Sequence, residues 1–121
     1  MQRICRAIGA AALVLAPLLL PKMAYAHAHL SRAEPRAGST VTPAPQEVSL
    51  WFTEGLESAF SSIEVRDASG ARVDEGEALV SGSTMHIGLK ALPPGTYKVN
   101  WRALSVDTHK TDGTFTFKVA K

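Results

Sequence analysis

The sequence predicts an all-β domain, either a β-sandwich or a small Greek-key barrel. Short segments of alternating or nearly continuous apolar residues recur from residue 48 onward, which is typical of strands packed in two layers. Clusters of Gly, Pro, Ser and Asp separate these segments and indicate turns. No stretch shows the apolar spacing of a helix, and residues 56–60 could form one helical turn at most.

Five segments carry the strand signal. We expect strands over residues 48–52, 63–65, 85–89, 97–101 and 115–119, with turns at 35–39, 43–45, 68–70, 81–83, 93–95 and 112–113. Because side chains alternate between the two faces of a strand, two sets are predicted to point into the core: Tyr97, Val99 and Trp101, and Phe115, Phe117 and Val119. Trp51 is expected to pack in or beside the core, with a binding platform as the alternative.

Residues 1–26 are predicted to be a secretory signal peptide. Arg3 and Arg6 precede an apolar run over residues 7–20, and Ala24-Tyr25-Ala26 forms an A-x-A cleavage site. The apolar run is shorter than the roughly 20 residues needed to span a bilayer, so an uncleaved anchor is the lesser alternative. We therefore expect export and cleavage after residue 26.

Residues 27–121 form the predicted mature domain. The whole chain has 13 Lys and Arg against 11 Asp and Glu, and only Arg3, Arg6 and Lys22 precede residue 27, which leaves 10 bases and 11 acids. This balance gives no cationic patch for nucleic acid, and no later apolar segment is long enough to cross a membrane. Cys5 is the only cysteine, so the mature domain is expected to have neither a disulfide nor a reactive thiol.

Cleavage would make His27 the first residue, and a terminal histidine offers a metal ion both its α-amine and its imidazole. Asp107 and His109 are a second pair of ligand-type residues. In an extended chain their side chains leave on the same face, with Cα atoms about 6.5–7 Å apart, so both can reach one ion. By itself, however, an Asp-x-His sequence is more often solvated surface, or Asp107 could cap a turn.

Three nitrogens and one oxygen are a donor set that suits Cu(II), with zinc as the competitor. We therefore expect one Cu(II) ion per mature chain, bound by His27, Asp107 and His109. His29 and Glu54 are weaker candidates, because His29 shares a strand face with His27 and Glu54 follows a predicted strand. An ordinary hydrogen-bonded histidine and an exposed carboxylate are the alternatives for these two residues.

Three other functions are compatible with the residues. A copper-dependent monooxygenase also begins with a metal-binding histidine, but Asp107 would occupy a position that oxygen chemistry needs open. A metal-free adhesive or chaperone-like sandwich is a second alternative. A hydrolase triad of Ser105, Asp107 and His109 is a third, disfavoured because the histidine must lie between the nucleophile and the acid. We expect no enzyme.

These segments together resemble the CopC family of periplasmic copper-resistance proteins (CopC/YobA-like). The resemblance covers residues 27–121 and runs in order through 27–30, 35–39, 51–54, 92–102, 105–109 and 115–119. It implies a seven-stranded Greek-key sandwich or barrel similar to cupredoxins and immunoglobulin domains. It also implies Cu(II) bound by His27, Asp107 and His109, with Glu54 as a less certain ligand.

The resemblance further implies a periplasmic carrier or buffer of Cu(II) that serves copper resistance and homeostasis, with a CopD-like transporter of the inner membrane as a possible recipient. Some members of the family also carry a methionine-rich loop with a histidine that binds Cu(I). The corresponding residues 69–83 contain neither Met nor His, so a second copper site is not expected here.

Overall fold

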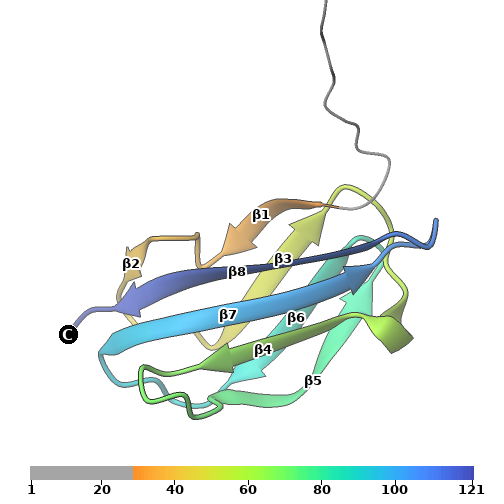
Figure 1. Cartoon of the computed structure of the whole chain (residues 1–121). Coiled ribbons are helices and arrows are strands. Elements are labelled where there is room, and N and C mark those ends of the chain that lie inside the picture. The colour runs from red at the N-terminus through yellow and green to blue at the C-terminus, as the bar shows by residue number, and fades with distance from the viewer. Residues whose placement is uncertain (1–28) are drawn as a thin grey trace, which may run out of the picture.

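The computed structural model describes residues 29–121, which form two four-stranded sheets packed face to face (Figure 1). The first sheet has the order β1-β3-β6-β5 and contains β1 (Leu30–Glu34), β3 (Glu47–Phe52), β6 (Thr84–Leu89) and β5 (Asp74–Ser81). The second has the order β2-β8-β7-β4 and contains β2 (Thr40–Val41), β8 (Lys110–Val119), β7 (Gly95–Leu104) and β4 (Ser62–Arg66). The predicted all-β sandwich is confirmed, with eight strands in place of about seven.

Helical structure within the described residues is confined to one 3-10 turn, η1 (Ser58–Phe60), inside the segment expected to allow a single turn. No helix of residues 29–121 has the length and apolar character needed to cross a membrane. The strand pairs are antiparallel except for β2 and β8, which run parallel and pair only at Thr40–Lys118 and Val41–Val119.

The core lies between the sheets and follows the alternation of the strands. Its fully buried members include Val48, Leu50, Val65, Met85, Ile87, Val99 and Phe117. Phe52 of the first sheet meets Trp101 of the second edge to face, with ring centroids 5.1 Å apart, and Tyr97 stacks on Phe117. The two predicted core sets are confirmed, although Phe115 is only partly buried.

Trp51 lies outside the core, on the outer face of β3. Its neighbours Leu50 and Phe52 are buried on the inner face, whereas Trp51 is half-buried and its ring lies 4.4 Å from the guanidinium carbon of Arg32 on β1. Because side chains alternate along a strand, burying Leu50 and Phe52 directs the indole outward. The cation–π contact with Arg32 covers part of it there.

Several parts of the fold differ from the sequence prediction: strands β1 and β2 were not expected, and two further differences have a structural cause. The predicted turn at residues 112–113 lies inside β8, where Gly113 pairs with Trp101 and leaves room for the indole. The acidic strand β5 was also not expected. Its pairing with β6 shifts register between Glu75 and Leu79, around Gly76, which has a φ of +74°. A bulge of this kind interrupts the period-two pattern by which strands are identified.

Candidate metal site

Asp107 and His109 lie in the tight turn that joins β7 to β8, so the segment is not extended. The N–H of Ser105 bonds to the carbonyl of His109 at 3.0 Å, and the N–H of Thr108 bonds to the carbonyl of Ser105 at 2.8 Å. Thr108 has a φ of +71°, in the left-handed region that reverses the chain direction. The turn, and not the pleat of a strand, brings the two side chains together.

The carboxylate and the imidazole are in contact. Nδ1 of His109 lies 3.3 Å from Oδ1 of Asp107, and the two side chains are 54% and 37% exposed, respectively. The pair therefore presents one nitrogen and carboxylate oxygen donors at a position that solvent and a dissolved ion can reach. In metal sites a ligand histidine commonly contacts a carboxylate through one ring nitrogen and binds the metal through the other.

The hydroxyl of Ser105 holds the carboxylate from the protein side. It donates a hydrogen bond to Oδ1 of Asp107, and it also accepts the N–H of His109 at 3.3 Å. The Ser105 bond is the main reason that the pKa of the Asp107 carboxyl is below its ordinary value; desolvation opposes it, and the contact with His109 adds to it. Asp107 is therefore an anion at neutral pH.

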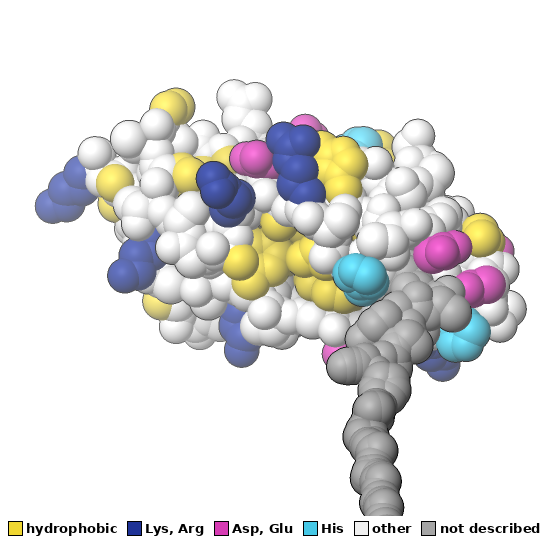
Figure 2. Space-filling model, turned by 90° about the horizontal axis from the view of Figure 1, so that it is seen from above, with side chains coloured by type: hydrophobic (Ala, Val, Ile, Leu, Met, Phe, Trp, Pro, Cys, Tyr) yellow, Lys and Arg dark blue, Asp and Glu magenta, His cyan; other side chains and the backbone are white. Residues whose placement is uncertain are grey.

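The start of the described chain lies at the same end of the sandwich. The N–H of His29 bonds to Oγ1 of Thr53 at 3.0 Å, and the N–H of Thr53 bonds to the carbonyl of His29 at 3.0 Å. Two residues further on, the carbonyl of Gly55 accepts the N–H of Val106 at 2.9 Å. Figure 2 shows histidine and acidic side chains gathered at this end of the molecule. The segment 53–55 thus lies between the first described residue and the Asp107 turn.

The expected ligands are only partly assembled within residues 29–121. His27 lies outside the described residues. Glu54 belongs to the segment that links His29 to the turn, but within the described part of the chain no three His, Cys, Asp or Glu side chains are grouped closely enough to hold a metal ion. The described residues therefore supply the pair Asp107 and His109, and a complete site needs donors from elsewhere.

A hydrolase triad is excluded by the same geometry. The Ser105 side chain is fully buried, and its hydroxyl bonds to the carboxylate of Asp107, not to the imidazole of His109. In a triad the histidine stands between the nucleophile and the acid and takes the proton of the nucleophile. The Ser105 hydroxyl instead bonds to the carboxylate of Asp107 and to the backbone of His109, contacts that the Ser-x-Asp-x-His spacing alone does not reveal.

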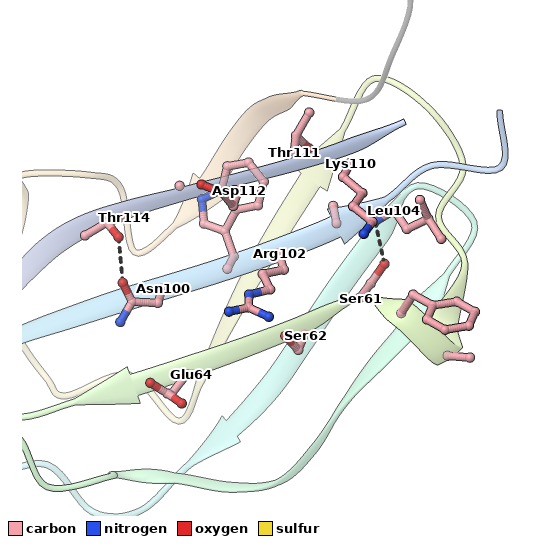
Figure 3. Close-up of a pocket in the computed structure, with 15 residues that line it drawn as sticks. Ser61, Ser62, Glu64, Asn100, Arg102, Leu104, Lys110, Thr111, Asp112 and Thr114 are labelled. Atoms are coloured by element: carbon pink, nitrogen blue, oxygen red, sulfur yellow. Dashed lines mark hydrogen bonds between the residues drawn. The ribbon is translucent and has the colours of Figure 1, made fainter. Parts of the chain in front are cut away.

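A depression of mixed polar and apolar lining lies on the second sheet and extends to Leu104 and Lys110, which flank the Asp107 turn (Figure 3). Glu64 of β4, Arg102 of β7 and Asp112 of β8 line it, and Thr114 donates a hydrogen bond to Asn100 across it at 2.6 Å. Its charges are mixed and its lining contains neither His nor Cys. The lining therefore offers no histidine or cysteine ligand for a metal ion.

The fold and the turn define a small β-sandwich with a histidine–carboxylate pair at the end where the described chain begins. The CopC domain model matches residues 30–120. The chain belongs to the CopC family, which confirms the resemblance drawn from the sequence.

Individual relatives agree. Protein YobA of Escherichia coli K12 is 33% identical over 98% of this chain and 99% of its own length. The Copper transport protein CutJ of Bacillus subtilis is 33% identical over 90% of this chain, but the match covers only 21% of CutJ. The crystal structure of PcoC, a methionine-rich copper resistance protein from Escherichia coli, superposes with a TM-score of 0.68 at 36% identity, covering 78% of this chain and 99% of PcoC.

Proposed function

We propose that the mature chain binds one Cu(II) ion at the end of the sandwich that carries the Asp107 turn. The proposed ligands are the α-amine and imidazole of His27, together with Asp107 and His109. His29 and Glu54 lie at the same end and are secondary candidates. The proposal includes removal of residues 1–26 as a signal peptide, because only a free His27 amine completes this donor set.

One observation supports the proposal: His29, which follows His27 by two residues, is bonded to the segment 53–55, and the same segment is bonded to the Asp107 turn. The backbone of His29 is bonded to Thr53, and the adjoining Gly55 is bonded to Val106, the neighbour of Asp107. Two residues of chain span at most about 7 Å. An amine, two imidazoles and a carboxylate are a donor set that favours the tetragonal geometry of Cu(II).

The biological role that follows is a periplasmic carrier or buffer of Cu(II) in copper resistance and homeostasis. The name of PcoC as a copper resistance protein and the name of CutJ as a copper transport protein both support this role. In CutJ a segment similar to this chain accounts for a fifth of a longer transport protein. A CopD-like transporter of the inner membrane is accordingly the proposed recipient of the ion.

The decisive experiment compares the mature protein with a form that carries one added alanine before His27. Mass spectrometry first establishes that the exported protein begins at His27. Cu(II) is then titrated into both forms and followed by electron paramagnetic resonance. We expect a nitrogen-rich tetragonal spectrum for the mature protein and its loss in the extended form. Equal affinity and identical spectra for the two forms would refute the proposed ligand set.

A further inference from the structure

The Ser105 side chain is a polar group in an apolar setting. It is fully buried at the end of β7, and its backbone forms an isolated bridge with Leu56, itself a core residue. A buried hydroxyl is costly unless its hydrogen-bonding capacity is used. Here the hydroxyl is used, because it donates a hydrogen bond to the carboxylate of Asp107.

The bonds that close the turn do not require this hydroxyl. Main-chain groups of Ser105 accept the N–H of Thr108 and donate to the carbonyl of His109, and any residue except proline could supply them. The side-chain oxygen lies 3.3 Å from the N–H of His109 and 3.2 Å from its carbonyl, longer contacts than a strong hydroxyl bond. The bond to Asp107 is therefore the distinctive contribution of the serine.

That bond fixes one end of the carboxylate. Ser105 donates to Oδ1, and Nδ1 of His109 lies 3.3 Å from the same oxygen. A carboxylate held in this way keeps a fixed orientation. A metal ion that binds there does not have to order the side chain first.

We propose that Ser105 is a positioning residue for the copper site: it orients Asp107 so that the carboxylate and the His109 imidazole are directed at the same ion. This inference rests on the proposed function. Ser105 itself does not touch the ion. It acts through Asp107, and its removal weakens binding only while Asp107 is present.

A double-mutant cycle tests this directly. Cu(II) affinity is measured by competition titration on mature protein for the parent, Ser105→Ala, Asp107→Ala and the double variant. We expect Ser105→Ala to weaken binding about tenfold, in the range found for partners of metal ligands, and to have no further effect in the Asp107→Ala background. A Ser105→Ala protein with parental affinity, or one whose loss persists in full without Asp107, would overturn the inference.

Two further variants separate positioning from general stability. Ser61→Ala removes another buried hydroxyl, which accepts the N–H of Leu104 at 3.1 Å and has no contact with Asp107. We expect it to lower the urea midpoint of the metal-free protein while leaving the affinity and the copper spectrum unchanged. Ser105→Thr keeps the hydroxyl and is expected to restore the parental spectrum. A threonine variant as weak as the alanine variant would count against a role for the hydroxyl.

The same titration separates a failure of the proposed ligand set from a failure of the proposed role of Ser105. If the parent does not bind Cu(II), or if Asp107→Ala binds it as well as the parent does, the proposed ligand set fails and the role of Ser105 fails with it. If Asp107→Ala weakens binding but Ser105→Ala does not, only the positioning role is wrong.

Discussion

The indole of Trp101 occupies the space that a side chain at position 113 would need. The two residues are paired across β7 and β8, and a Cβ added to Gly113 would lie 2.6 Å from Cζ2 and 2.9 Å from Nε1 of Trp101. Such distances are shorter than van der Waals contact. The tryptophan also packs edge to face on Phe52, so it cannot move aside without disturbing the contact between the sheets.

We expect Gly113→Ala to destabilise the fold by about 2 kcal/mol, the usual scale for overpacking a core. The free energy of unfolding in urea provides the measurement. Gly88→Ala is the matched control, because Gly88 is also a strand glycine and its added Cβ would meet only the carbonyl of Glu75 at 3.9 Å. That control should stay within about 0.5 kcal/mol of the parent. Equal losses in both variants would show that strand propensity, and not the indole, decides the effect.

Asp74 predicts a pH-dependent contribution to stability. Burial raises the pKa of its carboxyl, but the hydrogen bonds from Arg72 at 2.8 and 2.9 Å and from the N–H of Val65 at 2.7 Å outweigh burial and hold the pKa below its ordinary value. A carboxyl with a lowered folded-state pKa stabilises the protein above its unfolded pKa of about 3.9. The contribution disappears as the pH falls through the lower folded value.

We therefore expect Asp74→Asn to cost about 2 kcal/mol at pH 7, as for other hydrogen bonds to a charged group. The difference from the parent should shrink as the pH is lowered below about 4. Urea unfolding at a series of pH values measures both effects, and Glu75→Gln, at an exposed neighbouring carboxylate, is the control. A difference that does not change with pH would mean that packing, and not the charge of Asp74, stabilises the link to β4.

Thr111 offers a stabilising substitution. Its Oγ1 is buried and has no hydrogen-bond partner among the residues that the structure describes. Thr111→Val keeps the shape and removes the unpaired hydroxyl, so we expect a gain of about 1 kcal/mol in the free energy of unfolding. Thr114→Val on the same strand removes a hydroxyl bonded to Asn100 and should instead cost about 0.5 kcal/mol. If Thr111→Val is destabilising, the hydroxyl has a partner in the folded protein.

Copper affinity should fall as the pH is lowered from 8 to 5. Because its pKa is lowered, the Asp107 carboxyl remains ionised over this interval, so the fall must come from protons that compete for the nitrogen ligands. Asp107→Asn is then expected to weaken binding at every pH without changing the slope of affinity against pH. The extended form with a residue before His27 should show a smaller slope. An affinity that is flat between pH 8 and pH 5 would contradict a nitrogen-rich site.

The faces of the strands could be predicted from the sequence because burial follows their alternation, as Tyr97, Val99 and Trp101 show. Strands β1, β2 and β5 were not predicted, and for β5 the structure gives a physical reason. The bulge of β5 breaks the alternation near Gly76, and Gly113 resembles a turn residue although the indole of Trp101 explains it. Local residue type does not report a contact made across a sheet.

The same limit applies to the site. The ligand types Asp107 and His109 are visible in the sequence, but their approach depends on a non-glycine residue, Thr108, in the left-handed region. Such a conformation is uncommon for threonine and leaves no reliable signal in the chain. The proposed positioning role of Ser105 could be inferred only from its burial and its hydrogen bonds.

The short parallel pairing of β2 with β8 has a consequence for how copies of the protein meet. β2 pairs with only two residues of β8, so most of the outer edge of that ten-residue strand has no neighbouring strand among residues 29–121. Lys110, Asp112 and Lys118 lie on one face of this strand together with Thr114 and Thr116. Charged side chains on an open edge discourage strand addition from another molecule. Replacing Lys110 and Asp112 with valine would make the open edge of β8 a template for self-association and aggregation.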